Sequence, residues 1–168
     1  MTMKIGLLSD THSHIDERVL KHLKDCDEIW HAGDIGSLHV SDELKKITTF
    51  RAVYGNIDGA EIRSEFPRDL HFNLMGQTIW ITHIGGRPPR FAPGILANLK
   101  QLKPSIFICG HSHILLAKGC PEFEGIHLNP GAAGLYGNHA VRTLMRFNLA
   151  DHGIEDLEVV EIMRTARN

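Results

Sequence analysis

Five short apolar runs in this chain each stop at a side chain that can bind a metal ion. They end at Asp10, Asp34, Asn56, His83 and His111. Each run has the length of a buried strand, and the carboxyl ends of parallel strands share one edge of a sheet, where ligands bind. This pattern therefore predicts that polar groups far apart in the sequence meet at one rim of an α/β fold.

The first third of the chain alternates strand-like and helix-like segments. Strands are predicted at residues 4–8, 28–31 and 50–54, and helices at residues 16–24 and 37–47. Asp16 is suited to cap the first helix, because its side-chain oxygen can accept a backbone N–H of the first turn. Repeats of strand, helix and strand predict parallel strands joined by crossover helices.

The remainder of the chain is richer in strands. Residues 70–74 and 77–82 flank Met75-Gly76, which predicts a hairpin turn. A helix is predicted at residues 95–102, and further strands are predicted at residues 105–109, 114–117, 126–128, 141–148 and 157–162. We expect these strands to add in antiparallel fashion to the parallel start. The predicted fold class is α/β, with two mixed β-sheets packed as a sandwich flanked by helices, in one domain over residues 1–168.

Length, charge and cysteine content narrow the function classes. A chain of 168 residues suits a single core, and a formal net charge of −2 argues against nucleic-acid binding by bulk charge. No apolar run has the length of a membrane span, and residues 1–8 lack the layout of a signal peptide, so we expect no membrane partner. The three cysteines, Cys26, Cys109 and Cys120, follow no paired spacing, which is typical of a reducing cytoplasm.

Two more histidines extend the predicted cluster, because His12 and His113 each lie two residues beyond a strand end. The seven side chains comprise two carboxylates, one amide and four imidazoles. Such ligands without thiolate suit Mn²⁺, Zn²⁺, Fe²⁺, Ni²⁺ or Co²⁺ better than Ca²⁺ or Mg²⁺. Seven ligands are too many for one tetrahedral ion, so we predict two divalent metal ions with one bridging carboxylate. Ions about 3.5–4 Å apart can hold a bridging hydroxide that attacks phosphorus in line.

The order and spacing of these residues resemble the calcineurin-like metallophosphoesterase family, and the short length of the chain is similar to that of its small bacterial and archaeal phosphodiesterase branch. The matching motifs, from residue 5 to about residue 113, are Asp10-Thr11-His12, Gly33-Asp34, Gly55-Asn56, His83 and Gly110-His111-Ser112-His113. Asn129-Pro130-Gly131 resembles a later turn of the same family. The resemblance implies a four-layer α/β/β/α fold.

The resemblance also implies a role for each ligand. The first metal ion would be held by Asp10, His12, Asp34 and His113, and the second would be completed by Asn56, His83 and His111. Asp34 would bridge the two ions. Asp34, Asn56 and His83 would be the catalytic residues, with Asn56 also positioning the phosphate.

Two positions depart from the family pattern. Many members follow the asparagine with a histidine that acts as general acid and is paired with an acidic residue, whereas this chain has Ile57 and Asp58. Ile57 cannot donate a proton, so protonation of the leaving group falls to water, to Asp58 indirectly or to another residue. Small members often have Thr-His-Gly-His at the fourth motif, and here the motif is Thr82-His83-Ile84-Gly85, so the contact supplied by the second histidine is missing. The missing general acid favours phosphodiesters or substrates with good leaving groups.

Several other polar side chains have two interpretations. His31 either orients a ligand or makes a backbone hydrogen bond within its strand. His14, His31 and His127 are placed outside the predicted metal shell, and His22, His39, His71, His139 and His152 are interpreted as surface residues. Arg87 and Arg90 either bind phosphate oxygens or belong to a solvated loop.

The sequence thus predicts a cytoplasmic, metal-dependent phosphoric ester hydrolase, with Mn²⁺ favoured and a small-molecule phosphodiester as substrate. A phosphomonoesterase or nucleotidase is the enzymatic alternative. The alternative outside the enzymes is a non-catalytic metal-binding scaffold of the retromer-subunit type, which resembles this fold and serves mainly for protein binding. Scaffold relatives lose ligands, whereas this chain retains all seven. Monomer and homo-oligomer both stay open.

Overall fold

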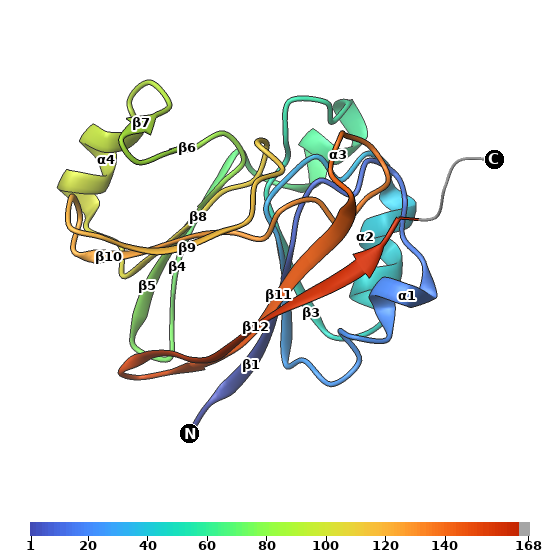
Figure 1. Ribbon diagram of the computed structural model, residues 1–168, viewed down its shortest axis with the longest axis horizontal. Helices are drawn as coiled ribbons and strands as arrows, with labels where there is room; N and C mark the ends of the chain where they lie inside the picture. The colour runs from blue at the N-terminus through green and yellow to red at the C-terminus, as the bar shows by residue number, and fades with distance from the viewer. Residues whose placement is uncertain (165–168) are drawn as a thin grey trace.

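Two five-stranded sheets pack face to face in the computed structural model, which describes residues 1–164 (Figure 1). Sheet A has the strand order β12 (Gly153–Met163), β11 (Val141–Ala150), β1 (Met3–Leu8), β2 (Glu28–His31) and β3 (Thr49–Ala52). Sheet B has the order β4 (Asp69–Leu74), β5 (Gln77–Thr82), β8 (Ile106–Ile108), β10 (Gly125–Asn129) and β9 (Leu116–Cys120). A separate short hairpin contains β6 (Gly86–Arg87) and β7 (Arg90–Phe91). The predicted sandwich of two mixed sheets is confirmed.

Helices cover the outer faces of both sheets (Figure 1). The helices are α1 (Glu17–Leu20), α2 (Leu38–Lys45) and α3 (Ala60–Glu65) beside sheet A, and α4 (Ile95–Leu102) beside sheet B. Asp16 caps α1 as predicted, by accepting the Val19 N–H at 3.2 Å. This helix is shorter than predicted, because the chain beyond it tightens into turns with bonds such as Leu23 N–H to Leu20 O at 2.9 Å. No helix within residues 1–164 is long and apolar enough to cross a membrane.

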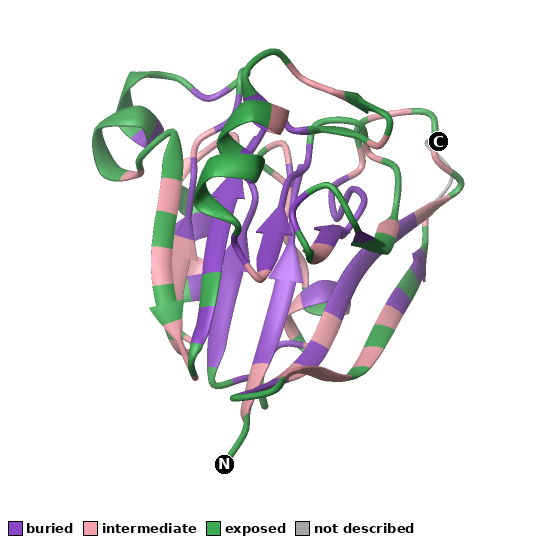
Figure 2. Cartoon of the chain, turned by 90° about the vertical axis from the view of Figure 1, so that its left-hand side faces the viewer, coloured by how far each residue is buried: buried purple, intermediate pink, exposed green. Residues whose placement is uncertain are grey.

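Alternation along the strands creates three separate apolar layers. In β1, Ile5 and Leu7 face the layer between the two sheets, whereas Leu8 faces the layer under the helices beside sheet A. A third layer lies between sheet B and α4, with Trp80 and Phe107 at its centre. Figure 2 shows the central strands as buried along most of their length. Burial on both faces explains why these strands read as continuous apolar runs in the sequence.

The topology of sheet B differs from the prediction. Its three inner strands, β5, β8 and β10, are parallel to one another, and antiparallel strands occur only at its two edges. The helix α4 is the crossover between β5 and β8, which makes this segment a second strand–helix–strand unit. The expectation of antiparallel additions is therefore wrong for the core of sheet B. Parallel pairing brings the carboxyl ends of β5 and β8 to the same edge.

Candidate metal centre

All seven predicted ligands lie just beyond the carboxyl ends of five strands. Asp10 and His12 follow β1, Asp34 follows β2, Asn56 follows β3, His83 follows β5, and His111 and His113 follow β8. The first three of these strands belong to sheet A and the last two belong to sheet B. The two sheets thus contribute to one cluster where their edges meet.

One group of candidate ligands gathers around Asp10. Its Oδ1 atom lies 3.1 Å from His113 Nε2 and 3.8 Å from His12 Nε2. Its Oδ2 atom accepts hydrogen bonds from the Ser9 hydroxyl at 2.6 Å and from the His111 backbone N–H at 3.1 Å. One oxygen of Asp10 is therefore anchored by protein donors, while the other faces two imidazoles.

The second group gathers around Asp34. Its Oδ2 atom lies 3.2 Å from His83 Nε2. Asn56 Oδ1 lies 3.1 Å from His83 Nε2 and 2.9 Å from His111 Nδ1. Asp34 Oδ2 also lies 3.6 Å from His12 Nε2, which belongs to the first group. Asp34 is placed where one carboxylate oxygen can be shared between two ions.

The atoms that face one another in both groups are carboxylate oxygens, an amide oxygen and ring nitrogens, all of which can act as acceptors. Asp10 Oδ1 and His12 Nε2 are buried and have no hydrogen-bond partner among the described residues. Within each group, the ligand atoms of the carboxylate and the two imidazoles lie within 4.8 Å of one another. Buried polar atoms without partners are costly, and a divalent cation in the group around Asp10 would satisfy both of these. The donor atoms of each group therefore fit a divalent metal ion.

Electrostatic interactions within the cluster shift the pKa values of its members. Burial raises the pKa of Asp10, but the nearby imidazoles of His113, His12 and His83 outweigh burial, so the pKa lies below its ordinary value. Burial lowers the pKa of His83, but the Asp34 carboxylate outweighs burial and raises that pKa. His83 Nδ1 donates to the Ala32 carbonyl at 2.8 Å, which directs Nε2 at Asp34. A cation would displace a proton there, because metal ions bind neutral imidazole.

Five of the seven candidate ligands have a left-handed backbone. The φ angle is 55° at Asp10, 46° at His12, 55° at Asp34, 67° at His111 and 58° at His113. For residues other than glycine this region costs about 1 kcal/mol or more. Hydrogen bonds between adjacent loops offset part of that cost, among them Asp10 N–H to Gly33 O and His12 N–H to Asp34 O, both at 3.0 Å. The strained turns aim the side chains at the rim.

Asp58 holds the loops of the centre together. Its buried carboxylate accepts the backbone N–H groups of Ile35 at 3.1 Å, Gly36 at 2.7 Å and Gly55 at 2.8 Å. These bonds tie the loop after β2 to the loop after β3. The structure does not support the interpretation that Asp58 helps to protonate a leaving group, because backbone donors already occupy both of its oxygens.

His31 orients the same loops from inside β2. Its Nδ1 atom accepts the Gly33 N–H at 3.1 Å, so Nε2 carries the proton and donates to the Thr11 hydroxyl at 2.9 Å. The Thr11 hydroxyl donates in turn to Ile35 O at 3.0 Å. Burial lowers the pKa of His31 to about 3, so the ring is neutral near pH 7. The structure favours the orienting role over a purely local backbone contact.

Asn129 fixes the turn that carries His111. Its Nδ2 group donates to Gly110 O at 3.0 Å and to Ser112 Oγ at 3.1 Å, and its Oδ1 atom accepts the Gly131 N–H at 3.0 Å. The turn at residues 129–131 therefore supports the position of a candidate ligand without facing the centre itself.

The interpretation of His139 as a surface residue is wrong. Its ring is half-buried, its centroid lies 5.5 Å from that of His113, and both ring nitrogens are buried without a partner among residues 1–164. Tyr136 stacks on His12 with a centroid distance of 5.0 Å. Arg164 holds this segment by donating to three of its backbone carbonyl groups. The segment has no strand or helix of its own, so no periodicity in the sequence places it beside the ligands.

The remaining polar residues singled out in the sequence lie away from the two groups. His14 pairs with the capping residue of α1 at 3.1 Å. His127 is buried in β10, with Nε2 3.1 Å from a cysteine thiol. Arg87 and Arg90 are exposed on the β6–β7 hairpin. His14 and His127 thus lie outside the two groups of candidate ligands.

Gly55→Ala is expected to lower the free energy of unfolding by about 2 kcal/mol or more and to weaken metal binding. A Cβ atom at Gly55 would lie 2.0 Å from Asp34 Oδ1 and 2.4 Å from the Asp34 backbone nitrogen. Denaturant unfolding and metal titration measure both effects. Gly59→Ala is the matched control, because a Cβ atom there meets no heavy atom within 4 Å. Equal stability of the two variants would contradict the prediction.

The chain is similar to known proteins along most of its length. Residues 3–152 match the model of the calcineurin-like phosphoesterase superfamily domain. A probable metallophosphoesterase of Methanothermobacter thermautotrophicus is 32% identical over 136 residues, which are 77% of this chain and 77% of that protein.

Two solved structures show the likeness of the fold. An archaeal phosphodiesterase superposes with a TM-score of 0.76 at 22% identity, over 95% of this chain and 100% of the other. Vps29 from Entamoeba histolytica, complexed with zinc, superposes with a TM-score of 0.71 at 21% identity, over 95% of this chain and 99% of the other. At these identities the likeness concerns the fold alone.

Proposed function

Since the chain belongs to the calcineurin-like phosphoesterase superfamily, we propose that it is a divalent-metal-dependent phosphodiesterase. The observation that carries this proposal is the position of Asp34. Its Oδ2 atom lies 3.2 Å from a ring nitrogen of His83 and 3.6 Å from one of His12. One carboxylate oxygen thus stands between two groups of ligand atoms, as a shared ligand of two ions requires.

We assign the ligands as the family pattern implies. Asp10, His12, Asp34 and His113 hold one ion, and Asp34, Asn56, His83 and His111 hold the other. Manganese is the proposed metal. When bound, the two ions supply Lewis-acid stabilisation of phosphate oxygens and lower the pKa of a shared water.

The chain's own contribution is to fix these groups before substrate arrives. The Ile57 backbone N–H donates to Asp34 Oδ1 at 3.0 Å and leaves Oδ2 directed at the ligands. The Asn56 side chain is exposed, so its amide can contact a phosphate oxygen from the solvent side. Groups fixed in advance lower the cost of reorganisation during the reaction.

Residues 57 and 58 favour substrates with good leaving groups, or phosphodiesters, over unactivated monoesters. Ile57 is 47% exposed beside the centre and has no proton to donate. The Asp58 carboxylate is occupied by three backbone N–H groups. Neither side chain can protonate a poor leaving group, so a substrate whose leaving group departs as a stable anion fits the site.

The experiment compares phosphate esters on the metal-free protein with and without added Mn²⁺. We expect Mn²⁺-dependent hydrolysis of bis(p-nitrophenyl) phosphate, with kcat/KM about tenfold or more above that for p-nitrophenyl phosphate. The two substrates share a leaving group, so the comparison isolates the second ester. Faster turnover of the monoester, or of a simple alkyl monoester, would point to a phosphomonoesterase or nucleotidase.

A non-catalytic scaffold is the second candidate, and the exposed apolar side chains favour it. Ile57, Ile84, Ile114, Leu115 and Tyr136 are 38–62% exposed, and all except Tyr136 lie within two residues of a candidate ligand. Such side chains can contact a partner protein. If the protein binds two ions but hydrolyses no ester, a non-catalytic scaffold would be favoured over a hydrolase.

A further inference from the structure

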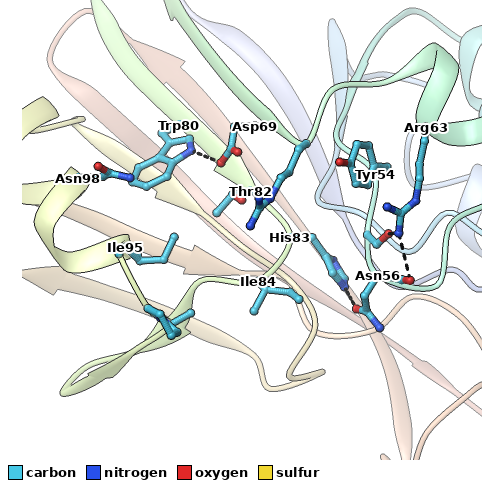
Figure 3. A pocket seen from close by; sticks show the side chains of 15 residues that line it. Tyr54, Asn56, Arg63, Asp69, Trp80, Thr82, His83, Ile84, Ile95 and Asn98 are labelled. Carbon is cyan, nitrogen blue, oxygen red and sulfur yellow. Dashed lines mark hydrogen bonds between the residues drawn. The ribbon is translucent and has the colours of Figure 1, made fainter.

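A cavity of about 590 Å³ opens beside the candidate metal centre. Asn56 and His83 line one end, and Trp80 and Asn98 line the other (Figure 3). A volume of this size lies within the range of small-molecule binding sites, roughly 300–1,000 Å³. A group attached to a phosphate at the metal centre therefore has room to extend from Asn56 towards α4.

Two arginines give this cavity a positive character. Arg63 and Arg68 both line it, and the one carboxylate in the lining is Asp69. Asp69 Oδ1 accepts the Trp80 indole N–H at 3.1 Å. No carboxylate lies within 4.0 Å of either guanidinium group among the described residues, in contrast to the arginines paired with Glu28 and with Asp16.

The two arginines are held in different ways. Arg63 lies over the Tyr54 ring at 4.6 Å, and its Nε donates to the Asp58 carbonyl at 2.6 Å. This arrangement ties Arg63 to the loop that carries Asn56. Arg68 is exposed just before β4, and no hydrogen bond, ion pair or ring contact occupies its guanidinium among residues 1–164. Arg68 thus keeps all of its donors for a ligand.

The uncharged part of the lining suits an organic group. Tyr54, Ile84 and Ile95 offer apolar surface, and Thr82 and Asn98 offer hydrogen-bonding atoms. A p-nitrophenyl ring alone would leave most of the cavity empty. A ring system with polar atoms and a further anion would use the apolar walls, the amide and the arginines together.

We propose that this cavity binds the second substituent of the phosphodiester, and that this substituent is of about nucleoside size and carries a further phosphate. The inference rests on the proposed phosphodiesterase activity and adds the substrate class. Arg68 is the specificity residue, because it can form a bidentate contact with that phosphate. The scissile bond joins the first phosphorus to the leaving oxygen, and water supplies the oxygen and the proton that balance the products.

The kinetic test uses two p-nitrophenyl esters of thymidine 5′-phosphate that differ by a 3′-phosphate. We expect the 3′-phosphate to raise kcat/KM about tenfold or more, because a charge-assisted contact is worth at least that factor. Arg68→Ala is expected to bring the ratio of the two kcat/KM values near one. Lys118→Ala is the control, because it removes the same charge from an exposed side chain of the edge strand β9, outside the cavity.

A binding test separates this inference from the catalytic proposal. Calorimetry on the metal-free protein compares thymidine 3′,5′-bisphosphate with thymidine 5′-monophosphate. We expect Arg68→Ala to weaken binding of the bisphosphate about tenfold, and we expect Lys118→Ala to leave it unchanged. Hydrolysis of both esters without any preference, or equal effects of the two variants, would overturn the cavity proposal. If the bisphosphate binds in a way that depends on Arg68 but no ester is hydrolysed, the proposed phosphodiesterase activity would be wrong. The proposed binding of a phosphate by the cavity would still hold.

Discussion

Asp34→Asn is expected to lower kcat/KM for bis(p-nitrophenyl) phosphate by about 10³-fold. The substitution keeps the size of the side chain and the acceptor for the Ile57 N–H, but it removes the charge shared between His83 at 3.2 Å and His12 at 3.6 Å. Without that charge, two cations near each other are no longer balanced by a common anion. Steady-state kinetics at saturating Mn²⁺ measures the loss.

The number of bound metal ions distinguishes loss of the bridging carboxylate from a general loss of structure. We expect the unmodified protein to bind two ions per chain and the Asp34→Asn protein to retain one. Asp151→Asn is the control, because Asp151 lies exposed in the turn between β11 and β12 and the change removes the same charge. A variant that keeps two ions and near-normal turnover would show that Asp34 is not the bridge.

Loading with Mn²⁺ is expected to stabilise the fold strongly, because each candidate group draws ligands from both sheets. Asp10 and His12 come from sheet A and meet His113 from sheet B, while Asp34 from sheet A meets His83 and His111 from sheet B. Metal at a thousandfold excess over Kd contributes about 4 kcal/mol per site. In a chain of this size, we expect Tm to rise by about 10 °C or more.

The measurement is thermal unfolding of one preparation with Mn²⁺ and after removal of metal by a chelator. His83→Ala should show a much smaller difference between the two conditions, since it removes a ligand of the second group. Comparing loaded and metal-free forms of the same variant cancels the effect of the mutation on packing. An unchanged Tm in the unmodified protein would mean that no cation joins the sheets.

The ends of the apolar runs could be predicted from the sequence. Those ends also predicted which polar side chains gather at the rim. Residues such as Ile5, Leu7 and Ile81 are buried between layers, so the sequence stays apolar until the chain leaves the sheet. The first polar residue then marks the rim. This signal depends on burial alone and not on strand direction. The predicted positions of the candidate ligands were therefore correct even though the predicted direction of the strands in sheet B was wrong.

Three features could not be predicted because no local pattern encodes them. The helix α3 is six residues long and buries only Ile62, too little for a recognisable period. The edge strand β9 begins two residues later than predicted, because its Leu-Ala-Lys-Gly-Cys sequence is mostly exposed. His139 reaches His113 through an irregular segment, and the backbone of that segment is held by the side chain of Arg164, 25 residues further along the chain.

The left-handed backbone at the rim predicts which substitutions would accumulate if catalysis were no longer selected. Glycine enters that backbone region without steric cost, so replacing His111 or His113, at φ 67° and 58°, with glycine would discard a ligand and relax the chain in the same step. Alanine at either position would discard the ligand and keep the strain. In homologues that are no longer selected for catalysis, we therefore expect glycine to replace histidine at these positions. Such proteins would keep the fold and lose the metal ligand.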